Sequence, residues 1–361
     1  MNKNYLLIGD HRTCENYGSI ATLEELIELM RPRRLSIIPI TRMDQDYNFM
    51  PVFFKDFDYY AEELNKGKAL IKEKRAINNS DKVIINAEGS LTHHTNAERC
   101  DGKYRARTRY MLFLAYYAIK FCNKEVSIVN HCVDPGNLSA EEMIKNIYPL
   151  LNKCWVRDQM SKNNLEKLGI NFAEYVPDAL FNYEHKENFN EQREFICIGD
   201  TATLGYADWD VANFFTSLII RLKKKGQKVI FIDGNMWKTT ELIRSLCEKL
   251  NIPWIHVDNT SWQNLTKILK KSKVFFSGRW HASILATLSG TPSILYGTDS
   301  HKTKALHEDL KFKGKFYELN ELPPNIDEIE SRLINVSNME SELLDYSKKQ
   351  RELLRLSYLK I

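Results

Sequence analysis

The chain has 361 residues, of which 43% are hydrophobic and 27% are charged. This length suits two lobes with separate cores, and the composition excludes a disordered or fibrous protein. The 51 basic and 47 acidic residues give a net charge of +4 and are spread along the chain. The chain therefore lacks a basic tail of the kind that would indicate a nucleic-acid partner, whereas the small positive net charge suits anionic substrates.

The cysteines and the apolar segments bear on the cellular compartment. Seven scattered cysteines, never in a C-x-x-C pair, disfavour a disulfide framework and a structural zinc site, and so indicate a reducing environment. The first residues lack an apolar signal region, and the longest apolar stretch, 110–119, is too short to span a bilayer. We expect a cytoplasmic protein with at most peripheral contact with the inner face of the plasma membrane.

In the first half of the chain, short apolar runs alternate with amphipathic segments. The pattern predicts helices at 20–30 and 104–121, and strands at 5–8, 35–38, 83–85, 126–129, 155–156 and 175–176. A β-α-β order of this kind predicts a mainly parallel sheet.

A polar stretch at 182–194 has almost no apolar periodicity and is the predicted linker. A second series follows, with helices near 208–224, 239–250, 262–271 and 282–288, and strands at 195–198, 229–232, 254–257, 274–276 and 294–296. The charged segment 325–359 reads as helical. We expect an α/β protein with two Rossmann-like, doubly wound lobes facing across a cleft: an acceptor-side lobe at 1–185, a donor-side lobe at 190–325, and a helical segment at 326–361 that crosses back to brace the first lobe.

Ligands of parallel α/β lobes collect where strands end and helices begin. The loop 9–21 falls at such a place and contains Asn16 and Gly18, which are either ligand-facing or simple turn residues. The segment 85–95 is a second candidate: Glu88 could deprotonate a sugar hydroxyl, and Gly89 allows close approach of a ligand. The plainer interpretation is a loop with a capping Ser90, and the adjacent pair His93 and His94 makes a poor metal site.

Three arginines lie close together at 105–109. Such a cluster more often marks a solvated face, but Arg105 or Arg109 could hold a carboxylate or phosphate through two hydrogen bonds if the cluster opened into the cleft.

The segment 273–306 is the most informative. A buried strand ends at Ser277, after which Arg279 and His281 stand at the mouth of a small, apolar helix. A guanidinium and an imidazole at such a turn suit an anion that undergoes proton transfer. The next predicted strand leads into another helix start that carries Ser300, His301 and Lys302. A histidine by itself would more often belong to the core, but its cationic neighbours favour a functional site here.

At these segments the chain resembles the polysaccharide pyruvyl transferase family. The matching stretches, in order, are ENYGSIATLEEL (15–26), NAEGSLTHH (86–94), VRDQMSKNNLEKLGI (156–170) running to VPDALF (176–181), and SGRWHASILATLSGTPSI (277–294). The resemblance implies a GT-B-like fold and transfer onto a sugar of a bacterial surface polysaccharide or its lipid-linked precursor. It also implies that Arg279 and His281 match the family's Arg-x-His pair, whose histidine is the general acid. Ala87 departs from the Gly-Glu-Gly run of the family.

We therefore expect transfer of a pyruvyl group from phosphoenolpyruvate, without a metal or another cofactor. His281 would supply a proton and Glu88 would act as base, while the predicted donor-binding residues are Arg279, Ser300, His301, Lys302, Arg105 and Arg109. The predicted acceptor-binding residues are Asn16, Gly18, Gly89, Ser90 and His93. The main alternative is a glycosyltransferase of the same architecture that uses a nucleotide-activated sugar, and the second is a non-catalytic sugar-phosphate binding protein. No oligomeric state is predicted.

Overall fold

The computed structural model describes residues 3–10, 17–31, 33–39, 53–66, 70–92, 106–135, 138–184, 192–201, 210–234, 238–297, 300–310, 315–318 and 324–361. The chain forms two compact units. The first unit comprises Met1–Glu15, Thr22–Ala179 and Leu353–Ile361, and the second comprises Asn16–Ala21 and Leu180–Glu352.

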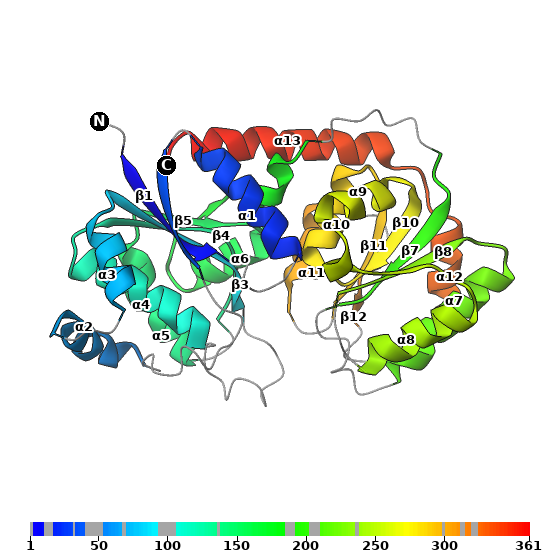
Figure 1. Ribbon diagram of the computed structural model, residues 1–361, viewed down its shortest axis with the longest axis horizontal. Helices are drawn as coiled ribbons and strands as arrows, with labels where there is room; N and C mark the ends of the chain where they lie inside the picture. Colours follow the sequence, from blue (N-terminus) through cyan, green and yellow to red (C-terminus); the bar gives the residue numbers. More distant parts are fainter. Residues whose placement is uncertain are drawn as a thin grey trace. The chain divides into compact units, whose positions relative to one another are not determined.

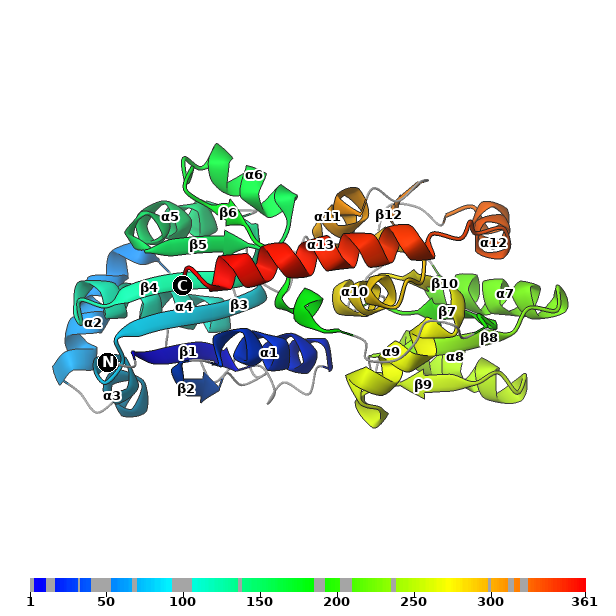
Figure 2. The same cartoon turned by 90° about the horizontal axis from the view of Figure 1, so that it is seen from above.

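The first unit is built on a six-stranded sheet with the order β2-β1-β3-β4-β5-β6 (Figures 1 and 2). Every pairing is parallel, as expected for strands joined by helical crossovers. The strands are β1 (Asn4–Asp10), β2 (Arg34–Pro39), β3 (Lys82–Thr92), β4 (Glu125–Asp134), β5 (Lys153–Val156) and β6 (Glu174–Tyr175).

Helices and short 3-10 turns connect these strands. They are α1 (Tyr17–Met30), η3 (Phe54–Asp56), α2 (Phe57–Lys66), α3 (Ile71–Asn78), α4 (Ala106–Lys120), α5 (Leu138–Ile147), η5 (Tyr148–Leu150), α6 (Gln159–Lys167) and η6 (Ala179–Asn182). Helix α4 is buried along most of its length, which fits its run of apolar and aromatic residues. Its side chains pack with those of β1, β3 and β4 in the core of the unit.

The second unit repeats this plan with a six-stranded parallel sheet of order β12-β11-β10-β7-β8-β9. Its strands are β7 (Phe195–Gly199), β8 (Val229–Asp233), β9 (Trp254–His256), β10 (Ser272–Ser277), β11 (Ser293–Gly297) and β12 (Tyr317–Glu318). Strands β10 and β11 are buried almost throughout, because a parallel sheet is covered on both faces.

The helices of the second unit follow the same alternation (Figure 1). They are α7 (Val211–Lys224), α8 (Lys238–Lys249), the turn η8 (Val257–Asn259), α9 (Trp262–Lys270), α10 (Trp280–Leu288), α11 (Lys302–Asp309), α12 (Ile326–Ile334) and α13 (Glu340–Tyr358). Two helices change unit along their length. Helix α1 begins with the second unit and continues with the first from Thr22, whereas α13 joins the first unit from Leu353.

The predicted fold class is confirmed: both halves are α/β, and each has a parallel sheet with helices between its strands. Each strand predicted from apolar runs overlaps a strand of the structure. Strand β12 was not predicted, because its two residues carry no periodic pattern. The predicted cleft and lobe limits stay predictions.

Candidate functional site

Polar side chains follow the buried strands of the second sheet at their carboxyl ends. Asp200 follows β7, Asp233 ends β8, His256 ends β9, and Ser277 ends β10, two residues before Arg279. Because the strands are parallel, these ends share one edge of the sheet, where ligands of α/β units bind.

Arg279 and Asp200 form a bidentate ion pair at this edge. The Nε of Arg279 donates to Oδ1 of Asp200 at 2.7 Å, and its Nη2 donates to Oδ2 at 3.0 Å. The side chain of Asp200 is 2% exposed and that of Arg279 is 13% exposed. Burial opposes the charge of the guanidinium, but the carboxylate of Asp200 outweighs it and raises the pKa of Arg279 above its usual value. Arg279 is therefore a fixed cation whose charge is largely offset.

Two glycines allow the chain to pass close to this pair. A Cβ on Gly278 would lie 2.6 Å from the ring of Tyr296, and a Cβ on Gly234 would lie 2.8 Å from Nη2 of Arg279. Neither position has room for a side chain, so the turns after β8 and β10 require glycine for steric reasons.

His281 lies in the first turn of α10 and packs against the start of α1. A Cβ on Gly18 would lie 2.3 Å from Nδ1 of His281 and 2.6 Å from its Cγ. Gly18 and His281 are 263 positions apart in the sequence, yet both belong to the second unit. The turn itself is held by Ser277, whose Oγ accepts from the amide of Arg279 at 3.0 Å, and by Ser283, whose Oγ donates to the carbonyl of Arg279 at 2.6 Å.

A second buried acid, Asp233, holds His256 and Arg244. Its Oδ1 accepts from Nδ1 of His256, and its Oδ2 lies 3.3 Å from Nε of Arg244. Burial raises the pKa of the Asp233 carboxyl, while the hydrogen bond from His256 and the charge of Arg244 work against that rise. These contacts fix the end of β8, and with it the following Gly234, whose amide donates to Oδ2 of Asp200 at 3.0 Å.

Ser300, His301 and Lys302 lie at the start of α11, on the neighbouring strand-to-helix connection of the same unit. All three are half-buried. The structure thus places the predicted donor-side residues of 279–302 in one unit, at the carboxyl ends of the adjacent strands β10 and β11.

In the first unit, Glu88 occupies an irregular part of β3. Its φ of +46° is unusual for a residue with a side chain, and the register between β3 and β4 shifts between Glu88 and Leu91. Glu88 is buried, and its interaction with Arg157 is one of the causes that raise the pKa of that arginine. Strained backbone and a buried charge mark this end of the sheet as a candidate site.

Arg157 follows β5 and is itself paired. Its Nη1 donates to Oδ2 of Asp178 at 2.7 Å and its Nε to Sγ of Cys132 at 3.1 Å. Burial works against the charge of Arg157, whereas Cys132, Asp178 and Glu88 raise its pKa. The first sheet therefore also carries a buried, charge-paired arginine at its carboxyl edge.

Other predicted residues are placed less completely. Asn16, His93 and Arg105 lie outside the described residues, and for Gly89 and Ser90 the structure gives the strand backbone of β3. Arg109 lies on α4 and is buried, so it is not on a solvated face as its sequence context favoured.

Asp200, Asp233 and His256 were missed in the sequence, although each stands at the carboxyl end of a predicted strand. The rule that selected Arg279 would have found the two acids, because Asp233 directly follows the apolar run 229–232 and Asp200 stands two residues after the run 195–198. His256 lies within the predicted strand 254–257, so the rule does not mark it.

The described residues hold no group of three or more His, Cys, Asp and Glu side chains arranged for a metal ion. Over the same ranges, no helix combines the length and apolar character needed to cross a membrane.

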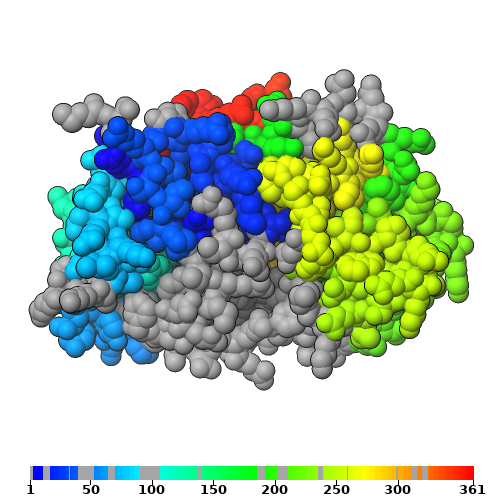
Figure 3. All heavy atoms as spheres, viewed as in Figure 1, coloured from blue at the N-terminus to red at the C-terminus, as the bar shows by residue number. Residues whose placement is uncertain are grey.

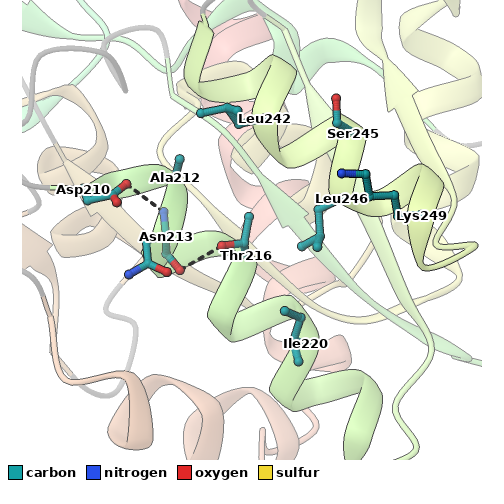
Figure 4. A pocket seen from close by; sticks show the side chains of 9 residues that line it. All are labelled: Asp210, Ala212, Asn213, Thr216, Ile220, Leu242, Ser245, Leu246 and Lys249. Carbon is teal, nitrogen blue, oxygen red and sulfur yellow. Dashed lines mark hydrogen bonds between the residues drawn. The ribbon is translucent and has the colours of Figure 1, made fainter.

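A groove between α7 and α8 lies elsewhere on the second unit. These helices form part of its surface (lime green in Figure 3), and the groove, of about 380 Å³, is lined by Thr216, Ile220, Leu242, Leu246 and Lys249 among others (Figure 4). It contains none of the predicted site residues, and Leu242 on its rim is 60% exposed. The groove is therefore separate from the candidate site.

Three solved structures show what the fold is similar to. UDP-GlcNAc 2-epimerase from Neisseria meningitidis, bound to UDP-GlcNAc, superposes with a TM-score of 0.58 at 12% identity over 99% of this chain and 100% of that chain. The UDP-GlcNAc 2-epimerase of Methanocaldococcus jannaschii gives 0.56 at 14% identity over 99% of both chains. A UDP-glucosyltransferase from Polygonum tinctorium gives 0.53 at 10% identity over 99% of this chain and 94% of that chain. The likeness shows a GT-B-like fold alone.

Sequence comparison gives a more specific result. Curated protein sequences include no significant match. The family model for polysaccharide pyruvyl transferase, however, matches residues 16–300, which is well over half of the chain and includes Gly18, Glu88, Arg279 and His281. The chain is therefore a transferase that belongs to the polysaccharide pyruvyl transferase family.

Proposed function

We propose that this enzyme transfers a pyruvyl group from phosphoenolpyruvate to two hydroxyl groups of one sugar in a bacterial surface polysaccharide or its lipid-linked precursor. The observation that carries the proposal is the turn at the start of α10, where a charge-paired Arg279 precedes His281, and Gly18 leaves space for the imidazole. The match of the chain to the family over residues 16–300 supports it.

The reaction requires one proton to be added and one leaving group to depart. The CH₂ carbon of phosphoenolpyruvate gains a proton and becomes a methyl group, and C2 forms two C–O bonds to the sugar oxygens. The C2–O bond to phosphate breaks, and inorganic phosphate leaves. The two sugar hydroxyls lose two protons, which balance the proton on the methyl carbon and the proton on phosphate.

His281 is suited to the proton transfer because an imidazole changes its charge near neutral pH. Its place in the first turn of α10 also puts it beside amide groups that favour an anion. Arg279 and Lys302 would supply hydrogen bonds and charge to the phosphate and carboxylate of the donor.

Glu88 is the proposed base toward an acceptor hydroxyl. Only the ionised form of a carboxyl can take a proton, and the interaction of Glu88 with the buried guanidinium of Arg157 supports this role. A lipid-linked acceptor would bring the enzyme to the inner face of the plasma membrane, so a cytoplasmic location with peripheral membrane contact is part of the proposal. Phosphoenolpyruvate enters as a co-substrate, without a metal or another cofactor.

The donor is tested first by binding. A ligand that binds only the folded protein raises the free energy of unfolding, by about 2.7 kcal/mol at a hundred times its Kd, and so raises the melting temperature. Phosphoenolpyruvate is compared with UDP-, CMP- and GDP-sugars, and we expect a shift with phosphoenolpyruvate. A shift with a nucleotide sugar alone would favour a glycosyltransferase instead.

Turnover is then measured as phosphate release, with mass spectrometry of the product on methyl hexopyranosides and on a lipid-linked oligosaccharide. His281→Gln should lower kcat by about 10² to 10⁴-fold with little change in melting temperature, because general acid catalysis typically contributes this much. His307→Gln on α11 is the matched control and should keep kcat. A folded His281→Gln with normal turnover would contradict the acid role, and binding without turnover in the wild type would favour a sugar-phosphate binding protein.

A further inference from the structure

The polar atoms of Asp200 form hydrogen bonds with residues at the ends of the two neighbouring strands, β8 and β10. Its two carboxylate oxygens accept from Arg279, and Oδ2 also accepts from the amide of Gly234. Its carbonyl accepts from the amide of Gly278 at 3.3 Å, and its own amide donates to the carbonyl of Ile232 at 3.1 Å. A carboxylate bound in this way has a single orientation.

The sheet order explains why Asp200 can do this. Strand β7 lies between β10 and β8, so its carboxyl end stands between the turn that carries Arg279 and the turn that carries Gly234. The side chain of Arg279 spans this distance, because its Nη2 would be 2.8 Å from a Cβ on Gly234. Asp233, held by His256 and Arg244, anchors the β8 side.

The pairing changes what Arg279 can offer a ligand. Asp200 accepts from Nε and from one Nη2 hydrogen, which leaves the Nη1 hydrogens and the second Nη2 hydrogen for a donor molecule. The nearby carboxylate also offsets the positive charge, so hydrogen-bond direction counts for more than net attraction at this turn. The hydrogen bonds of the guanidinium can orient a ligand only if the guanidinium itself has a fixed position.

We propose that Asp200 is a positioning residue of the transfer reaction, which fixes the Arg279 guanidinium and thereby the Arg279–His281 turn. The inference rests on the proposed function for its kinetic test. Asp200 touches Arg279 and the backbone, and it acts through them. A displacement of a reacting group by about 1 Å can cost about 10²-fold in rate, which sets the expected size of the effect.

The test compares Asp200→Asn and Asp200→Ala with Arg279→Ala and the double variant Asp200→Ala/Arg279→Ala. Asn keeps an acceptor for Nε but loses the charge and places an NH₂ group against other donors. We expect kcat with phosphoenolpyruvate to fall about 10²-fold in Asp200→Ala and less in Asp200→Asn, with the KM for the acceptor nearly unchanged. The double variant should be no slower than Arg279→Ala, because Asp200 acts through Arg279.

Asp327→Asn is the matched control. Asp327 on α12 also pairs with an arginine, Arg221, but its side chain is 74% exposed, so the loss should leave kcat and KM unchanged. Asp200→Ala leaves a buried arginine without its partner and can fail to fold. Asp200→Asn and the double variant then decide the question, since neither leaves the Arg279 side chain wholly without a partner.

The outcomes separate the two proposals. A folded Asp200→Asn with wild-type kcat, or a double variant much slower than Arg279→Ala, would overturn the positioning role. If the wild type does not turn over phosphoenolpyruvate, the proposed function fails and the pairing is judged from melting temperatures. In that case a decrease in melting temperature of the double variant that is smaller than the sum of the two single decreases supports the coupling of Asp200 to Arg279, and an additive decrease overturns it.

Discussion

Replacing Gly18 by alanine should disable the enzyme through His281. The new Cβ would lie 2.3 Å from Nδ1 of His281, whereas ordinary contact begins at 3.4 Å, so the imidazole must move by about 1 Å. A shift of this size in a reacting group can cost about 10²-fold in rate. Alanine is the better helix former by about 1 kcal/mol, so a weaker α1 would not explain the loss.

The assay is the kcat for phosphate release, with the imidazole signals of His281 followed by NMR. A double variant separates displacement of the ring from other effects. Because the Cβ of His281 is itself only 2.7 Å from the new methyl group, the background is His281→Gly, which removes the three nearest atoms. By itself Gly18→Ala should lower the melting temperature through this clash, and in the His281→Gly background it should not. A Gly18→Ala enzyme with normal kcat and unshifted His281 signals would refute the reasoning.

Two further predictions concern stability. Nδ1 of His131 donates to the carbonyl of Trp155, and burial lowers the pKa of His131 from 6.5 to about 3. Below pH 6.5 the unfolded chain binds a proton at His131 that the folded protein does not bind. As the pH falls from 6.5 to 3, this site should therefore lower the free energy of unfolding by about 1.4 kcal/mol per pH unit. Urea titrations of His131→Gln should lack this contribution, and an unchanged pH dependence would contradict the assignment. Arg193 donates to Thr291 and to four backbone carbonyls where α9 and α10 end, so Arg193→Met should lower the free energy of unfolding by about 3 kcal/mol. The control is Arg31→Met, whose side chain is 73% exposed and which should change it by less than about 0.5 kcal/mol. Equal effects would show that the hydrogen bonds of Arg193 do not stabilise the fold.

The repeated strands were predictable because each is a short apolar run, and the local order of the chain suffices to place Arg279 at a strand end. The partners of Arg279 and His281 were not. Asp200 is 79 residues from Arg279, and Gly18 lies in a helix whose sequence fits a plain turn equally well. Their roles depend on which strand lies beside which, and the order β10-β7-β8 arises from crossovers that a linear pattern does not contain.

The pattern of charges in the sequence did not show which charged residues are buried. The arginines of 105–109 look like a solvated cluster, but Arg109 is buried, like most residues of helix α4. Glu88 was predicted to follow the strand at 83–85, whereas it lies within β3, where its positive φ coincides with the irregular pairing of β3 with β4.

The division of α1 between the two units matters for protein dissection. Expressing residues 180–352 alone would omit Asn16–Ala21, which group with that half, and would remove the glycine that packs on the imidazole of α10. The fragment would retain Arg279, Asp200 and His281 but would lose the segment that packs against His281. A peptide with the sequence of α1, added in trans, would be the natural complement, so split-protein work on this enzyme should begin from a pair of fragments rather than from a single cut.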